Sequence, residues 1–188
     1  ISTAAVYEVT KNDVFPNENH PTSPLNSYTA TKLACEQLIE CYAINYAIPA
    51  TILRPQVIYG PTRGAEGSTA GVTTAIKEAA AGRKFSIPFS GQTCFVYTED
   101  MGQYCGKSLL QSPHSFAIYN IPGQSLRIKD IATKINKCCA EARVTYKENV
   151  YPFPKGLDSQ KFIKDFPECV ITDFENALEL MFAEFTVF

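Results

Sequence analysis

The sequence predicts an α/β protein with a mostly parallel sheet, and three observations support this prediction. Short apolar or β-branched segments alternate with stretches of helical spacing, as in units of strand, helix and strand. Of the 188 residues, 45% are hydrophobic and 19% are charged, which allows a sizeable core and excludes a disordered chain. Residues 1–7 are small and β-branched, as in a strand covered on both faces. Because the chain starts at Ile1 without Met, we expect it to be a fragment.

The first half of the chain reads as loop, helix and strand. Residues 9–27 are rich in proline, asparagine and polar spacers, which predicts a long loop, and long loops in compact domains are usually functional. Residues 28–46 contain no Gly or Pro, and their apolar residues recur at helical spacing, which predicts a long helix. Residues 50–54 predict a short strand that ends at Pro55.

The second half continues the alternation. Residues 60–71 form a glycine-rich loop before a helix. Ser125 is the predicted N-cap of a helix that runs to about residue 138, and Thr172-x-x-Glu175 is a capping box for a last helix. The other expected elements are strands at 84–87, 93–97 and 116–121 and helices at 72–81, 100–111 and 172–185.

Charge and composition exclude several classes of function. The net charge is −2 and no basic block is present, which argues against nucleic acid or an anionic membrane as a partner. Seven cysteines without a C-x-x-C pair indicate reduced thiols, and hence a cytoplasmic protein. His20 and His114 lie far apart beside prolines, so we expect no metal site.

The pair Tyr28-x-x-x-Lys32 is the first candidate for chemistry. Residues four apart on a helix share a face, and an ammonium beside a phenol favours the phenolate, which makes the tyrosine a general acid or base. The same spacing recurs twice elsewhere in the sequence, so spacing alone is weak support. The context is stronger, because Tyr28 opens a long helix after a long loop, and Thr3 ends a predicted buried strand 25 residues earlier.

Three motifs in this order carry a family resemblance: STAAVYE, SPLNSYTATKLACEQ and ILRPQVIYGP. Together they resemble the extended short-chain dehydrogenase/reductase family, which includes NAD-dependent nucleotide-sugar epimerases and dehydratases. The resemblance continues to the last helix. It implies the C-terminal part of a Rossmann-type, doubly wound parallel sheet at residues 1–122. It also implies a small α/β substrate lobe at residues 123–188, with chain crossings between the two.

The resemblance also implies roles for individual residues. Tyr28 would be the acid/base for a substrate hydroxyl, and Lys32 would favour its phenolate and hold the nicotinamide ribose of NAD or NADP. Thr3 matches the family's catalytic Ser/Thr, which positions the hydroxyl and relays its proton. The turn against the nicotinamide matches three residues: Pro55, Gln56 and Val57. For Thr3 and Gln56, ordinary packing at a strand end is the alternative.

Departures from the family pattern widen the range of functions. The glycine fingerprint for a dinucleotide is absent, and Gly64-x-x-Gly67-x-x-x-Gly71 has a different spacing, so we expect a substrate-side loop or a plain flexible loop there. Thr93 stands where many relatives have an Arg that grips the nucleotide diphosphate, and Val57 stands where epimerases often have Asn. A sugar, a sugar acid or a nucleotide sugar therefore remains open as the substrate.

The expected function is that of an NAD(P)-dependent epimerase or dehydratase whose fragment is inactive as given. Two alternatives remain: a simple NAD-dependent sugar dehydrogenase, and a truncated, non-catalytic remnant that acts as an interaction module. The resemblance implies a homodimer through the helix that carries Tyr28 and Lys32.

Overall fold

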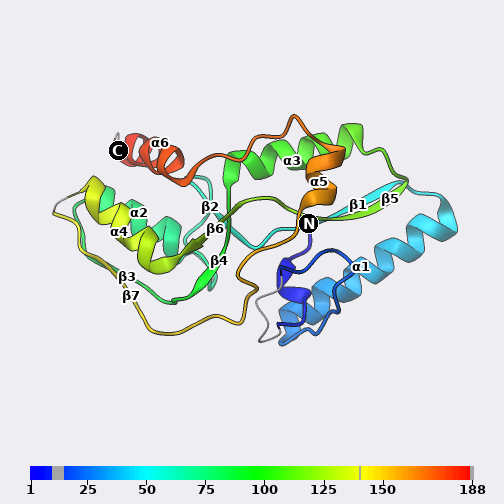
Figure 1. Ribbon diagram of the computed structural model, residues 1–188, viewed down its shortest axis with the longest axis horizontal. Coiled ribbons are helices and arrows are strands. Elements are labelled where there is room, and N and C mark those ends of the chain that lie inside the picture. Colours follow the sequence, from blue (N-terminus) through cyan, green and yellow to red (C-terminus); the bar gives the residue numbers. More distant parts are fainter. Residues whose placement is uncertain (10–14, 140, 187–188) are drawn as a thin grey trace.

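The computed structural model describes residues 1–9, 15–139 and 141–186 (Figure 1). Its first half contains η1 (Ala4–Val6, a 3-10 helix), α1 (Ser27–Tyr46), β1 (Ala50–Arg54), β2 (Val57–Tyr59), α2 (Gly71–Ala80), β3 (Phe85–Ile87) and β4 (Gln92–Tyr97). The second half contains α3 (Thr98–Gln111), β5 (Phe116–Asn120), β6 (Gln124–Arg127), α4 (Ile128–Cys138), β7 (Val144–Tyr146), α5 (Gln160–Asp165) and α6 (Phe174–Thr186).

The strands of the described residues pair mostly in parallel. β1 pairs with β5, β2 with β4, and β3 with β7, all in parallel. β6 adds to β4 in the antiparallel direction. The strands form three small sheets, of which the central one has the order β2-β4-β6. The predicted α/β architecture with mostly parallel pairing is confirmed.

Two hydrophobic clusters hold these sheets to their helices. One cluster joins β2, β3, β4 and β7 to α2, α4 and α6, which lie together on the left of Figure 1. The other joins β1 and β5 to α3 and α5 on the right. Each cluster contains residues from both sides of residue 122. The domain division at that residue stays a prediction.

The strand predicted at residues 1–7 is wrong in its central part. Ser2 N and Ala4 N donate to the carbonyl oxygens of Leu53 and Pro55 at 2.8 Å each, so the segment starts along the edge of β1. The Thr3 side chain then accepts the Ala5 N–H at 3.2 Å and caps the short helix η1. A local cap thus turns the chain away from the sheet, against the β preference of these residues.

Two predicted helix caps are also wrong. Ser125 lies inside β6, where its hydroxyl accepts from Gln92 Nε2 at 2.9 Å, and α4 begins only at Ile128. Thr172 donates its N–H and its hydroxyl to the buried Asp100 carboxylate, at 2.8 and 2.6 Å. At the start of α6, Phe174 N donates instead to Gln124 Oε1 at 2.7 Å, and Glu175 N donates to Asp173 Oδ1 at 2.9 Å.

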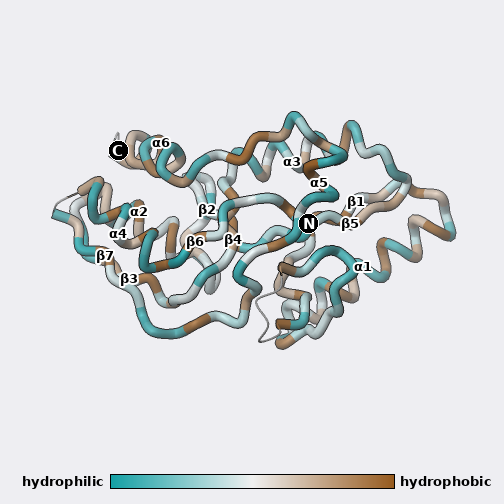
Figure 2. Tube along the Cα trace, in the orientation of Figure 1, coloured by the Kyte–Doolittle hydropathy of each residue, from teal (hydrophilic) through white to brown (hydrophobic). Residues whose placement is uncertain are grey.

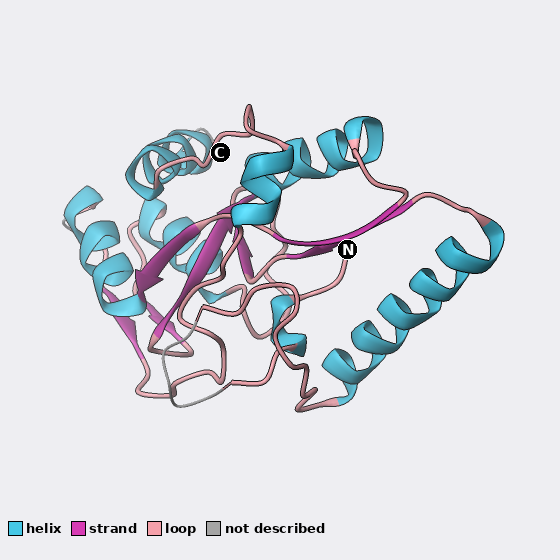
Figure 3. Cartoon of the chain, turned by 45° about the vertical axis from the view of Figure 1, so that its right-hand side comes forward, coloured by secondary structure: helices cyan, strands magenta, loops and turns pink. Residues whose placement is uncertain are grey.

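Helix α1 covers little of the rest of the chain. It begins with a capping box, in which Asn26 Oδ1 accepts from Thr29 N at 3.0 Å, and it runs along one rim of the molecule in both views (Figures 1 and 3). Of its 20 residues only Thr29 and Glu36 are buried. Several residues along this helix appear brown in Figure 2. The exposed aliphatic residues of α1 include Leu38 and Ile44, and Tyr42 and Tyr46 are exposed as well. Within the described ranges, no helix is long and apolar enough to span a membrane.

Candidate functional site

The predicted pair Tyr28 and Lys32 lies at the start of α1. The capping box places Tyr28 in the first turn, with 56% of its surface exposed. The Lys32 ammonium is 5.9 Å from the centroid of the Tyr28 ring and donates to the Ile1 carbonyl oxygen at 3.1 Å. The lysine is therefore held beside the phenol ring by the segment that contains Thr3.

A cavity of about 350 Å³ joins segments that are far apart in the sequence. Thr3, Tyr28 and Gln56, three of the predicted site residues, line it together. The glycine-rich loop contributes Gly67 and its neighbours, and the far C-terminal part of the chain contributes Phe153. The remaining lining residues are Ala5, Asn26, Thr29, Arg63, Ser68 and Thr69. Hydroxyl, amide and guanidinium groups beside the aromatic rings of Tyr28 and Phe153 suit a polar, polyhydroxylated ligand.

The turn predicted to face the nicotinamide is only partly at this cavity. Gln56 lines it, but both ends of its amide have protein partners: Nε2 donates to the Pro154 carbonyl at 2.8 Å, and Oε1 accepts from Cys94 N at 2.9 Å. Val57 is buried as the first residue of β2, and Pro55 is buried at the end of β1. Neither lines the cavity, nor does Lys32.

The Cys94 side chain, next to the turn at Pro55–Val57, is shielded from solvent. Cys94, on β4, is 3% exposed, and burial raises the pKa of its thiol to about 12. A thiol with so high a pKa stays protonated at neutral pH and is a poor nucleophile. Cys94 does not line the cavity, and its backbone N–H serves only to hold the Gln56 amide oxygen.

Sequence reasoning missed several lining residues. Asn26 and Thr29 carry a local signal, since Asn followed three residues later by Thr before a helical run is a capping pattern. Arg63, Ser68 and Thr69 lie within the loop that was expected to face the substrate. Phe153 has no local signal, because only the tertiary fold brings it to the cavity.

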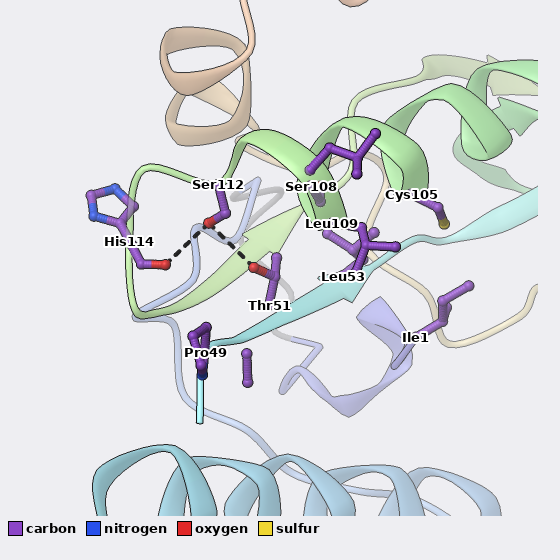
Figure 4. Close-up of a pocket in the computed structure, with 11 residues that line it drawn as sticks. Ile1, Pro49, Thr51, Leu53, Cys105, Ser108, Leu109, Ser112 and His114 are labelled. Atoms are coloured by element: carbon purple, nitrogen blue, oxygen red, sulfur yellow. Dashed lines mark hydrogen bonds between the residues drawn. The ribbon is translucent and has the colours of Figure 1, made fainter. Parts of the chain in front are cut away.

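A second, larger hollow lies at the edge of β1 (Figure 4). It has a volume of about 470 Å³ and is lined by Ile1, Pro49, Thr51 and Leu53 on one side and by α3 residues such as Leu109 on the other. The Ser108 hydroxyl is buried here without a hydrogen-bond partner among the described residues. None of the predicted site residues lines it.

Comparisons with known proteins agree with this fold. The UDP-glucuronic acid 4-epimerase from Bacillus cereus, solved with NAD, matches 99% of this chain with a TM-score of 0.79 and 22% identity. A monomeric L-threonine 3-dehydrogenase from a metagenome matches 99% with a TM-score of 0.87 and 16% identity. The chain covers 60% and 64% of these two structures. These likenesses define the class: a Rossmann-type, doubly wound α/β protein.

The sequence itself gives the family. Residues 1–121 match the model of the NAD dependent epimerase/dehydratase family, and the chain belongs to that family. A trifunctional UDP-glucose 4,6-dehydratase/UDP-4-keto-6-deoxy-D-glucose 3,5-epimerase/UDP-4-keto-L-rhamnose-reductase of Arabidopsis thaliana is 30% identical over 95% of this chain. The chain spans 28% of that relative's length. The resemblance to the extended short-chain dehydrogenase/reductases is confirmed, and the family is NAD dependent, in agreement with the predicted cofactor.

Proposed function

We propose that this chain carries the acid/base part of an NAD-dependent enzyme that epimerises or dehydrates a nucleotide sugar, with a simpler sugar or sugar acid as the other substrate classes. The observation that carries the proposal is the cavity at which Thr3, Tyr28 and Gln56 meet. The Arabidopsis relative and the Bacillus cereus epimerase act on UDP-sugars, which supports a nucleotide sugar as the substrate. Phe153 at the cavity supports a substrate-binding role for residues 123–188.

Tyr28 is the proposed acid/base. Its phenolate would take the proton of a substrate hydroxyl, and the phenol would return that proton when a carbonyl is reduced. The Lys32 ammonium lies one helical turn further along α1, 5.9 Å from the centroid of the Tyr28 ring. At 56% exposure the phenol group is accessible to a ligand in the cavity.

Thr3 is the proposed partner of Tyr28. Its oxygen already accepts the Ala5 N–H, at 3.2 Å, so its own hydroxyl proton is left to donate. Thr3 would donate this proton in a hydrogen bond to the oxygen of the substrate hydroxyl, which positions that hydroxyl to transfer its own proton to Tyr28.

The residues present fit the nicotinamide half of NAD. Lys32 has three N–H donors, and within the described part of the chain one of them is used, on Ile1. The others would hold ribose hydroxyls. Both ends of the Gln56 amide are already hydrogen-bonded to the protein. The turn at Pro55–Val57 would therefore pack against the nicotinamide without a hydrogen bond from the Gln56 side chain. NAD held there would supply the hydride acceptor for the substrate carbon.

The test compares Tyr28→Phe with Tyr42→Phe, since both tyrosines lie on α1 and are 56% exposed. In the protein as its cells make it, supplied with NAD and UDP-glucose or UDP-glucuronic acid, ¹H NMR follows the formation of the 4-epimer or the 4-keto-6-deoxy sugar. We expect Tyr28→Phe to lower kcat by roughly 10²–10⁴-fold, the contribution of a positioned acid/base. Tyr42→Phe should leave kcat unchanged. Equal activity of the two variants contradicts the proposal.

The same assay distinguishes the simple sugar dehydrogenase. An epimerase or dehydratase returns its hydride within one cycle, so free NADH does not build up. A dehydrogenase releases NADH in proportion to the oxidised sugar, and absorbance at the NADH band reports it.

The hollow at the β1 edge favours an interaction module as the second candidate function. Ser2 and Ala4 pair with β1 only at Leu53 and Pro55, so the edge of Ala50–Ile52 that faces away from β5 has no partner among the described residues. Unpaired edges beside apolar side chains are typical docking sites for another strand. The intact mass of the protein from its source cells separates the candidates: a mass near 20.8 kDa favours the module, and a clearly larger mass favours the enzyme.

We further propose a cytoplasmic homodimer. All seven cysteines are free, which supports a reducing compartment. The exposed apolar side chains of α1 support a dimer contact through the helix that carries Tyr28 and Lys32.

A further inference from the structure

One guanidinium lies where the segments of the candidate site converge. Arg54 is the last residue of β1 and directly precedes Pro55 and Gln56. It is 3% exposed, and its hydrogen bonds to Glu36 and to Tyr7 join it to other segments of the chain. A buried arginine is costly unless its fork of donors is satisfied, so its partners define its role.

The first partner is Glu36, on α1. Arg54 Nε donates to Glu36 Oε1 at 2.9 Å, and Arg54 Nη2 pairs with Glu36 Oε2, which makes a two-pronged ion pair. Glu36 follows Lys32 by four residues and Tyr28 by eight, so the three side chains lie along one stripe of the helix. Apart from Glu36, α1 buries only Thr29, so this ion pair fixes the rotation of α1 about its own axis and with it the direction in which the stripe faces.

The second partner is Tyr7, on the segment that begins with Thr3. Arg54 Nη1 donates to the Tyr7 hydroxyl at 2.8 Å, and that hydroxyl donates to Asn120 Oδ1 at 2.7 Å. The backbone of Tyr7 closes η1, the short helix that Thr3 caps, through its N–H to Ala4 O at 3.2 Å. The arginine thus joins the helix of Tyr28 to the turn of Thr3.

We propose that Arg54 is a positioning residue, which holds the Tyr28–Lys32 stripe of α1 in register with Thr3 across the cavity. The inference rests on the function proposed above, because it assigns Arg54 a part in placing the acid/base beside its relay hydroxyl. Arg54 itself does not line the cavity.

The experiment replaces the buried pair by apolar residues, as Glu36→Leu/Arg54→Met, since removing both charges together avoids leaving one of them buried alone. The matched control is Glu78→Leu/Arg83→Met. There the same fork joins Arg83 to Glu78 on the surface, at 2.5 and 3.0 Å. Amide hydrogen exchange, read by mass spectrometry, and thermal unfolding are measured for both.

We expect exchange to speed up about tenfold or more in residues 3–7 and 27–36, as for the loss of one or two hydrogen bonds to a charged group. Helix α4 should keep its exchange rate, and the control should leave residues 3–7 and 27–36 unchanged. Unchanged exchange in 27–36 overturns the inference. So does an equal rise in every element, which would mean that the pair only stabilises the fold as a whole.

A milder variant covers the case in which the double variant does not fold. Arg54→Lys keeps the charge but loses the planar fork. It should give the same local pattern with a smaller increase, and wild-type exchange throughout overturns the inference equally.

A second readout separates this inference from the proposed function. In the protein as its cells make it, the double variant should lower kcat for the UDP-sugar at least tenfold with little change in KM. If kcat falls only in proportion to the loss of folded protein, so that each folded molecule keeps its activity, the positioning role is overturned. If Tyr28→Phe has no effect on activity, the proposed function fails, whereas the exchange pattern still decides whether Arg54 fixes α1.

Discussion

Gly60 is a position at which both the backbone angles and the surrounding space favour glycine. It follows β2 with a φ of 149°, and an added Cβ would collide with the Thr98 side chain. Gly60→Ala should therefore destabilise the protein by about 3 kcal/mol, from backbone strain and overpacking together. Urea unfolding followed by circular dichroism measures this.

The control for that substitution is Gly102→Ala. Gly102 is exposed inside α3, with open space where the Cβ would go. Alanine should stabilise this helix by about 0.5–1 kcal/mol. A Gly60→Ala variant as stable as the wild type would show that Thr98 moves aside without cost.

Tyr7 makes stability depend on pH in the alkaline range. Burial raises its pKa from 10.0 to about 12, although the nearby Arg54 lowers it. Below pH 10 the phenol is neutral in both states, so its contribution is fully present. Between pH 10 and 12 only the unfolded chain ionises, so the free energy of unfolding should fall, by about 1.4 kcal/mol per pH unit for one such group.

Urea unfolding at pH 8 to 11 tests this expectation. Tyr59, Tyr104 and Tyr119 have pKa values raised by burial as well, so they add to the fall. Stability that stays constant from pH 9 to 11 contradicts the prediction.

Among the elements, the end of α1 carries a removable strain. Ala47 is its C-cap and has left-handed angles, φ 53° and ψ 35°, which cost a residue with a Cβ about 1–2 kcal/mol. Ala47→Gly should stabilise the protein by about 0.5–1 kcal/mol, since part of that gain is offset by glycine's greater freedom when unfolded. Ala81→Gly, at the α2 C-cap with φ −89°, should give no gain. Thermal unfolding of the two variants decides.

The long elements could be predicted from the sequence because their signals are local. The helix expected at 28–46 lies at Ser27–Tyr46, and the strand expected at 50–54 is β1. The strands β2 and β7 were not predicted, because three residues are too few to show the alternation of a strand, although the residues of both favour strands. Thr3 was expected in a strand, but its side-chain cap prevails locally.

The candidate site also has one part that could be predicted from the sequence and another that could not. Tyr28 and Lys32 could be found because their helical spacing, the long loop before them and the family motifs together single out this pair. The meeting of Thr3, Tyr28 and Gln56 at one cavity depends on tertiary structure and was available only through the resemblance. The two hydrogen bonds that occupy Gln56 could not be foreseen, since their partners lie 38 and 98 residues away.

At the scale of the whole molecule, the exposed apolar faces predict association. Leu38 on α1 is 60% exposed, and Leu109 on α3 is 84% exposed beside the β1 edge. If copies pair through α1, Leu38→Glu should convert the dimer to a monomer, whereas Leu109→Glu should leave it dimeric. Light scattering after size-exclusion chromatography measures the mass. The reverse pattern would assign the contact to the β1 edge instead.

The pairing of β3 with β7 has a consequence for how the protein is made. Phe85–Ile87 leaves the ribosome long before its partner Val144–Tyr146, and α2 must likewise wait for α6. Contacts between segments so distant along the chain form slowly, and until they form the apolar faces stay open to solvent. Synthesis of this chain therefore includes an interval in which its first half is complete but unprotected, and a chaperone that binds apolar segments would have its greatest effect then.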